Sequence, residues 1–195
     1  MTASSRLAHL RPPYAPDVAQ ALERMMPKES LVEPLNLFRT FAKNLPFATA
    51  MGPLGGFMLS RGKQGGAAYD ARSREVVIDR VTARCGCEYE WGVHIASYAK
   101  KVDLTNEQIY STVHGAPSDD CWDDRDRALL EMVDQLHDTG SVTDGVFTTL
   151  RGHFNEPQII ELFALAGWYH AISYVANGCG TELEDWAPRF PGRRA

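Results

Sequence analysis

The chain has 195 residues and a net charge of −5, from 20 Lys and Arg against 25 Asp and Glu. Hydrophobic residues make up 44% and charged residues 23%, which is typical of a globular domain and excludes a wholly disordered chain. The acidic balance gives no general attraction to nucleic acid or anionic lipid, and neither a membrane-spanning apolar stretch nor the apolar segment of a signal peptide is present. We therefore expect a cytoplasmic protein that binds neither nucleic acid nor membrane.

The domain organisation follows from prolines and from hydrophobic periodicity. Prolines near the start predict an extended arm over residues 1–16, and a second proline-containing segment predicts a tail over 181–195. Between them, over 17–180, apolar residues recur at steps of three and four, and no window alternates as strands do. The sequence therefore predicts one all-α domain, a bundle of about six to eight helices.

In chain order, the periodicity predicts helices over 18–26, 35–44, 74–84, 87–101, 123–138, 146–150 and 157–176. The segment that starts at Pro46 is apolar but loosened by three glycines. Thr105 and Gln108 have the spacing of a capping box, which marks a further helix start. Asn177 and Gly178 are suited to the C-cap of the last helix.

The four cysteines are too few for a disulfide framework in a chain of this length. Cys85 and Cys87 stand close together, but no second Cys/His cluster with ligand-like spacing accompanies them. Cys121 and Cys179 have no neighbouring base. We expect reduced thiols and no metal site.

The segment after Gly86 is best suited to chemistry. If a helix begins near Cys87, residues at i, i+3, i+4 and i+7 share one face. Four side chains then project together: Cys87, Glu90, Trp91 and His94. The helix dipole favours a thiolate at Cys87, the carboxylate and imidazole can pass a proton, and the indole can raise a carboxyl pKa by desolvation.

The same residues also have a purely structural interpretation. Cysteine is among the most buried residue types, so Cys87 could be a packing residue. His94 could be a core or interface histidine, and Glu90 could pair with Arg84 or Lys101. Spacing alone leaves both interpretations open.

Three consecutive motifs lie between Arg72 and Thr112: R-x-R-E-V-V-I-x-R-V-x-x-R, then C-E-Y-E-W-x-x-H, then D-L-T-x-E-Q-I. With them the chain resembles the carboxymuconolactone decarboxylase family, which includes the alkyl hydroperoxidase D branch, over residues 30–180. The resemblance implies an all-α homo-oligomer, trimeric or hexameric, that acts on a small-molecule substrate. It implies no metal and no organic cofactor.

The resemblance also assigns site residues. Glu75 matches the glutamate that joins the proton relay of hydroperoxidase members, Cys87 matches the first cysteine of their C-x-x-C pair, and His94 matches the histidine after it. Glu90 stands where the second cysteine is usual, and Tyr89 stands where an additional relay histidine is usual. This departure puts the dithiol chemistry of the redox branch in doubt.

Our first hypothesis is therefore a cofactor-free acid–base enzyme that decarboxylates a small lactone or aromatic-derived acid. In it, His94 and Glu90 transfer protons, Glu75 orients His94, and Cys87 is an auxiliary thiol. Two alternatives stay open: a thiol-dependent peroxidase in which Cys85 or an external thiol resolves oxidised Cys87, and a non-catalytic small-molecule-binding protein.

Substrate binding is expected at Arg84, Tyr89 and Trp91, because a guanidinium suits a substrate carboxylate and the rings can line a pocket. Salt bridging to nearby acidic residues is the alternative for Arg84. In the run Trp168 to His170, a helical step of about 100° prevents the three side chains from sharing a face. The first two are interpreted as core or interface, and His170 as a candidate to reach the pocket.

Overall fold

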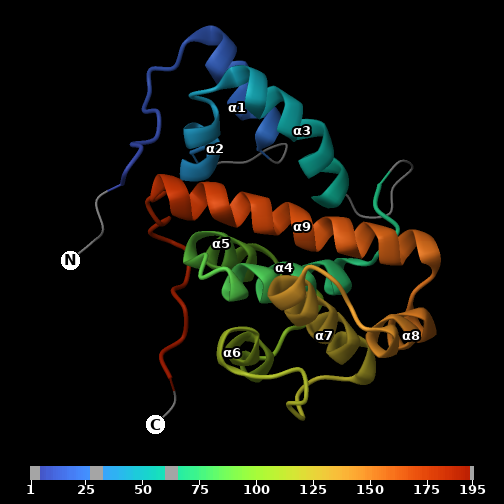
Figure 1. Ribbon diagram of the computed structural model, residues 1–195. Helices are drawn as coiled ribbons and strands as arrows, with labels where there is room; N and C mark the ends of the chain where they lie inside the picture. The colour runs from blue at the N-terminus through green and yellow to red at the C-terminus, as the bar shows by residue number, and fades with distance from the viewer. Residues whose placement is uncertain (1–4, 27–32, 60–65, 194–195) are drawn as a thin grey trace.

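A computed structural model describes residues 5–26, 33–59 and 66–193 of the chain, and every regular element in them is a helix (Figure 1). The helices are α1 (Pro16–Met25), α2 (Asn36–Phe41), α3 (Leu45–Leu59), α4 (Ala71–Arg84), α5 (Glu88–Tyr98), the 3-10 helix η1 (Ala99–Val102), α6 (Asn106–His114), α7 (Asp124–Thr139), α8 (Asp144–His153) and α9 (Glu156–Cys179). The all-α prediction is confirmed. The nine α-helices of the described residues exceed the expected six to eight, because the glycine-rich segment after Pro46 forms a continuous helix, α3, that contains Pro53.

Side-chain caps set most helix starts. The Asp70 carboxylate accepts a hydrogen bond from the Ser73 amide at 2.8 Å and begins α4. The predicted capping box is present at α6, where Thr105 Oγ1 accepts from the Gln108 amide at 3.2 Å and the Gln108 side chain accepts from the Thr105 amide at 3.0 Å. These local signals explain why the sequence places the starts well.

The end of α9 was predicted wrongly. The helix continues past Ala176 to Cys179 and ends at Gly180, which has the left-handed backbone (φ +62°) that glycine adopts without strain. The amides of Arg6 and Leu7 each donate to the Cys179 carbonyl at 3.0 Å. The segment before α1 thus satisfies the last carbonyls of α9, a contact that no local pattern reveals. Residues 1–4 of the predicted arm and 194–195 of the predicted tail lie outside the described residues.

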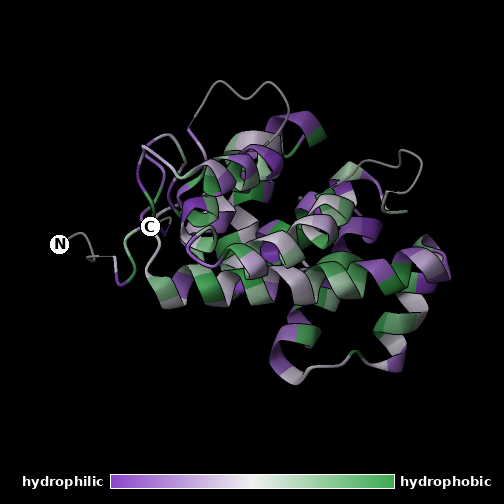
Figure 2. Ribbon diagram, turned by 90° about the horizontal axis from the view of Figure 1, so that it is seen from above, coloured by the Kyte–Doolittle hydropathy of each residue, from purple (hydrophilic) through white to green (hydrophobic). Residues whose placement is uncertain are grey.

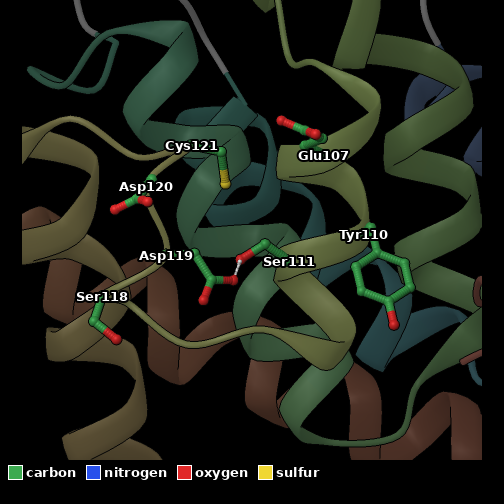
Figure 3. Close-up of a pocket in the computed structure, with 7 residues that line it drawn as sticks. All are labelled: Glu107, Tyr110, Ser111, Ser118, Asp119, Asp120 and Cys121. Carbon is green, nitrogen blue, oxygen red and sulfur yellow. Dashed lines mark hydrogen bonds between the residues drawn. The ribbon is translucent and has the colours of Figure 1, made fainter. Parts of the chain in front are cut away.

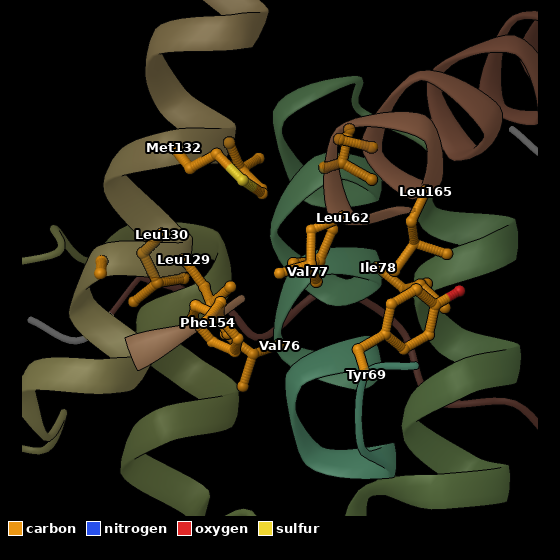
Figure 4. Packing of buried hydrophobic residues seen from close by; sticks show 14 of the residues in the cluster. Tyr69, Val76, Val77, Ile78, Leu129, Leu130, Met132, Phe154, Leu162 and Leu165 are labelled. Carbon is orange, nitrogen blue, oxygen red and sulfur yellow. The ribbon is translucent and has the colours of Figure 1, made fainter. Parts of the chain in front are cut away.

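The main core forms where α4 meets α7 and α9 (Figure 4). Its side chains include Val76, Val77, Ile78, Leu129, Leu130, Met132, Leu162 and Leu165, all at most 1% exposed. Burying each such side chain contributes about 1.5–3 kcal/mol relative to leaving it in water. The result is a rigid frame around α4, which carries Arg74, Glu75 and Asp79 of the candidate site described below.

Ion pairs fix the register of α4 against α7. Arg72 pairs with Asp126 at 2.7 Å, Arg80 pairs with Asp134 at 2.6 Å, and Arg84 pairs with Asp138. All three pairs join residues 54 positions apart, so the two helices run parallel and in step.

A second, smaller core joins α2 and α3, which lie on the other side of α9, to α5 and α9 (Figure 1). It joins Leu37 and Phe41 of α2 to Ile172 and Ala176 of α9. By length and composition α9 is apolar enough to cross a membrane, but its position between the two cores is that of a core helix. Viewed from above, the helices carry hydrophilic and hydrophobic residues in mixed order, as amphipathic packing requires (Figure 2).

Candidate active site

A buried carboxylate–imidazole pair joins α4 to α5. Glu75 Oε2 lies 2.7 Å from His94 Nδ1, and the two residues are 0% and 4% exposed. A carboxylate at this distance accepts a hydrogen bond from Nδ1–H, so it fixes both the orientation of the ring and its tautomer. Nε2 is therefore the nitrogen left to exchange a proton.

Two further side chains face that nitrogen. The Tyr169 hydroxyl of α9 lies 3.0 Å from His94 Nε2, and the two rings meet edge to face with centroids 5.1 Å apart. Glu90, one turn before His94, places Oε2 3.7 Å from the same nitrogen. Three helices thus contribute to one chain of donors and acceptors: Glu75, His94, and then Tyr169 with Glu90.

Arg74 supplies the positive charge of this cluster. Its Nε donates to Glu75 Oε1 at 2.5 Å, and its Nη1 donates to the Leu59 carbonyl at 2.8 Å. The guanidinium lies 5.0 Å over the Tyr98 ring, which is 5.4 Å from the His94 ring. Arg74 Nη2 is buried and has no hydrogen-bond partner among the described residues.

The two carboxyls beside His94 titrate in opposite directions. Burial raises the pKa of Glu75, but the charges and hydrogen bonds of His94 and Arg74 outweigh it and hold that pKa below its usual value. Burial raises the pKa of Glu90, which only the charge of His94 opposes, so its pKa lies above the usual value. Burial also raises the pKa of Tyr169 well above its usual range, which keeps its hydroxyl protonated. The cluster therefore places one carboxyl with a lowered pKa and one with a raised pKa beside a single imidazole.

Asp79, one turn after Glu75, is a second buried acid. It is 1% exposed, and neither of its carboxyl oxygens has a hydrogen-bond partner in the described part of the chain. Burial and the charge of Glu75 raise its pKa well above the usual value, so it is held protonated.

The predicted thiolate at Cys87 is wrong. Cys87 is the N-cap of α5 and is fully buried. Burial raises the pKa of the thiol to about 12, with a smaller contribution from the Glu90 carboxyl, and the Glu90 amide offsets only part of this. Desolvation outweighs the helix dipole here because no water reaches the sulfur. Cys85 and Cys87 are both free thiols.

Two predicted substrate-binding residues have their polar groups engaged elsewhere. The Arg84 guanidinium pairs with Asp134 and Asp138 of α7, which matches the salt-bridge alternative with different partners from those expected. The Tyr89 hydroxyl donates to Glu184 at 2.6 Å. None of these bonds is to a member of the His94 cluster.

Trp91 likewise points to another neighbourhood. Its indole Nε1 donates to Thr112 Oγ1 at 3.0 Å, and its ring lies 5.2 Å from the Phe190 ring. These contacts do not support the expectation that the Trp91 indole desolvates a carboxyl such as Glu90, although both residues are on α5. Substrate binding by these three residues stays a prediction.

Sequence reasoning missed Arg74, Asp79 and Tyr169 as members of the cluster. Arg74 and Asp79 lie within the matched motifs, but charged residues on an amphipathic helix are usually solvated, so burial was the missing information. Tyr169 was interpreted as core or interface, and its 75-residue separation from His94 leaves no local signal. Trp168, Tyr169 and His170 do point to three different neighbourhoods, as the helical step requires.

A surface pocket of about 420 Å³ lies away from this cluster, between α6 and the segment before α7 (Figure 3). Its lining residues are Glu107, Tyr110, Ser111, Ser118, Asp119, Asp120 and Cys121. The Ser111 hydroxyl donates to Asp119 Oδ2 at 2.7 Å across it. None of the predicted site residues lines this pocket.

No protein-family model matches the chain, and no curated protein matches its sequence. Solved structures do match its shape. An uncharacterized peroxidase-related protein from Silicibacter sp. TM1040 has a TM-score of 0.78 at 17% identity, over 98% of this chain and 100% of that one. The alkylhydroperoxidase AhpD core of an uncharacterized peroxidase-related protein from Ralstonia eutropha JMP134 has a TM-score of 0.74 at 19% identity, over 92% and 93%.

A third similar structure is that of the debrominase Bmp8, as a cysteine-to-alanine variant in complex with 2,3,4-tribromopyrrole. Its TM-score is 0.72 at 15% identity, over 95% of both chains. Identities this low establish a shared fold and leave the chemistry to be argued from the side chains.

Proposed function

Starting from the alkylhydroperoxidase D-like fold that this chain has, we propose that the protein is an enzyme that transfers protons to a small carboxylated compound. Decarboxylation of a lactone or aromatic-derived acid is the reaction we propose. One observation carries the proposal: His94 lies between a carboxyl whose pKa is lowered, Glu75, and one whose pKa is raised, Glu90. Pairs of acids that the environment separates in this way are typical of acid–base sites.

The groups in this mechanism have different roles. Glu75 keeps the His94 proton on Nδ1 and stabilises the imidazolium if Nε2 takes a second proton. The raised pKa of Glu90 favours its protonated form, which can release a proton to a substrate atom. The Tyr169 hydroxyl lies 3.0 Å from Nε2 and keeps that nitrogen hydrogen-bonded before substrate arrives.

In decarboxylation, the bond between the carboxylate carbon and its neighbour breaks and CO₂ leaves. The electron pair moves into a conjugated carbonyl of the substrate itself, and the resulting enolate takes a proton on carbon. Glu90 or protonated His94 supplies that proton, and solvent restores it. The substrate must therefore contain a carbonyl conjugated with the carbon that loses CO₂.

Arg74 is a better placed anchor for the substrate carboxylate than the predicted Arg84. Its Nη2 is a buried cationic donor without a partner in the described structure, whereas Arg84 is paired with α7. A charge-assisted bond from a guanidinium to a carboxylate is strong and directional.

A thiol-dependent peroxidase is the second candidate. Two similar structures are of peroxidase-related proteins, which supports this candidate. The raised pKa of the buried Cys87 thiol opposes it, because the thiolate is the form that attacks peroxide.

The deciding experiment compares wild type with Glu90→Gln, His94→Gln and Cys87→Ser. CO₂ release is followed with a panel of lactone acids, and peroxide consumption is followed with dithiothreitol as reductant. We expect Glu90→Gln and His94→Gln to abolish CO₂ release and Cys87→Ser to retain it. Rapid peroxide consumption that Cys87→Ser removes would establish the peroxidase instead.

A small-molecule-binding protein that catalyses no reaction is the third hypothesis, and the result expected of it differs from those of the two enzymes. It would show a ligand-dependent rise in Tm with no turnover of the same compound. The homo-oligomer, a trimer or hexamer, and the cytoplasmic location remain proposals. Light scattering on the purified protein tests the first of them.

A further inference from the structure

Three potential metal ligands from three helices meet at one end of the core. Cys85 is the C-cap of α4, His137 lies in the last turn of α7, and His170 lies on α9. One donor atom from each, the Cys85 sulfur and a ring nitrogen of each histidine, lies within 4.8 Å of the others. All three residues are half-buried, so an ion from solvent can reach them.

The fold holds this group in place. Arg84, adjacent to Cys85, pairs with Asp138, adjacent to His137, and this contact keeps the ends of α4 and α7 together. Asn177 of α9 donates from Nδ2 to the Cys85 carbonyl at 2.9 Å. Because Asp138 neutralises Arg84, the nearest guanidinium charge does not oppose a bound dication.

One imidazole nitrogen of the group lacks the hydrogen-bond partner that a buried nitrogen normally has. His137 Nδ1 is buried and makes no hydrogen bond to any described residue. The His137 and His170 rings lie nearly parallel, 7° apart with centroids 5.1 Å apart, so each offers the other a face and no donor or acceptor. Buried polar nitrogens without a partner are rare and costly, which calls for a ligand here.

We propose that Cys85, His137 and His170 bind Zn²⁺, with a fourth coordination position left for water or an external ligand. Thiolate and imidazole are the ligands that Zn²⁺ prefers, whereas Mg²⁺ and Ca²⁺ prefer oxygen. Tetrahedral bonds of about 2.0–2.3 Å place ligand atoms roughly 3.3–3.6 Å apart, so the group closes by about 1 Å as one ring tilts out of the stack. On binding, the Cys85 thiol loses its proton to solvent and the sulfur lone pair forms the bond to zinc.

The site differs from the acid–base cluster in every ligand. None of Glu75, Glu90 or His94 belongs to it, so the two proposals succeed or fail separately. The proposal departs from the sequence expectation of no metal site, because Cys85 and His137 are 52 residues apart along the chain and His137 and His170 are 33 residues apart. Only the docking of α4, α7 and α9 brings them together.

The test uses the full chain, reduced and freed of metal with a chelator. Co²⁺ is titrated first as a spectroscopic probe, because a thiolate ligand gives an intense charge-transfer band, and Zn²⁺ is then added to displace it. We expect one equivalent to bind. Cys85→Ser is expected to abolish the band, and His137→Gln and His170→Gln are expected to weaken binding at least about tenfold each. The matched controls Cys179→Ser and His153→Gln should bind as wild type does.

A second measurement does not depend on how the variants fold. In wild type, Zn²⁺ should protect Cys85 from alkylation while leaving Cys179 unprotected, as peptide mass spectrometry reports. Wild type that binds no Zn²⁺ at about 10 µM, or that binds it without protecting Cys85, would overturn the proposal. Preference for Cu⁺ over Zn²⁺ at the same three ligands would overturn the assignment of the metal.

Discussion

Two polar clusters that both draw on α9 differ in how their members are joined. In the first, Glu75, His94 and Tyr169 form hydrogen bonds of 2.7 and 3.0 Å to one another. In the second, His137 and His170 stack without a hydrogen bond between them, and His137 Nδ1 has no partner among the described residues. Both draw on α9, and each also draws on the α4 segment of the chain.

The two clusters therefore differ in what holds them together. In the first, Glu75 joins Arg74 to His94, although Arg74 Nη2 and both Asp79 carboxyl oxygens have no partner among the described residues. The second is held by a ring stack, and His137 Nδ1 has no partner in the same part of the chain. Removing a member should therefore destabilise the fold strongly in the first cluster and weakly in the second.

The largest expected effect is that of Glu75→Ala. It leaves the Arg74 and His94 side chains buried without their shared carboxylate, which should lower the free energy of unfolding by about 3–5 kcal/mol. Urea denaturation measures this loss. Arg84→Ala on the same helix is the control: its pair with Asp138 is 31% and 57% exposed, so the loss should stay below about 1 kcal/mol. Equal losses in the two variants would contradict the account.

The next effect is on the pH dependence of stability. Because the pKa of Glu90 is raised in the folded protein, the folded state keeps a proton that the unfolded chain releases above its ordinary pKa of 4.5. Stability should therefore fall as pH rises above that value, and Glu90→Gln should make the fall smaller. Asp79 contributes a slope of the same sign, which the variant retains. Denaturation curves at a series of pH values give both slopes.

Glu75→Gln gives the matched comparison for that experiment. The pKa of Glu75 is lowered, so its contribution is present above its unfolded pKa and is lost as pH falls through the folded one. This variant should flatten the acid side of the profile and leave the fall above 4.5 in place. Profiles of identical shape in both variants would show that the two carboxyls do not differ.

The smallest expected effect is that of His137→Leu in the absence of metal. The variant removes a buried nitrogen that has no hydrogen-bond partner and keeps an apolar side chain of similar width. We expect the free energy of unfolding to change by less than about 1 kcal/mol in either direction. A loss as large as that of Glu75→Ala would mean that His137 has a structural role that its contacts do not reveal.

Helix positions were predictable where the signals are local. The helix expected over 123–138 is α7, Asp124–Thr139, because the Asp123 carboxylate caps it at 2.8 Å from the Asp126 amide and Gly140 ends it with a φ of +74°. The end of α9 was missed because it depends on amides from the start of the chain.

The candidate site was predictable only in part. The spacing of Glu90 and His94 on one helix, together with the resemblance that singled out Glu75, named three residues that the structure brings together. Burial decided the rest. It protonates Cys87 against the expectation from the helix dipole, and it brings in Tyr169 from a distant helix.

The central claim is that the pKa of Glu75 lies below, and the pKa of Glu90 above, the ordinary value of a glutamate in the same folded molecule. Carbon-13 NMR of protein labelled at the glutamate side-chain carboxyls measures this directly, with Glu75→Gln and Glu90→Gln to assign the two signals. When the two signals are followed through a pH titration, the account predicts a midpoint below the ordinary glutamate pKa for Glu75 and above it for Glu90. Equal midpoints, or the reverse order, would contradict it.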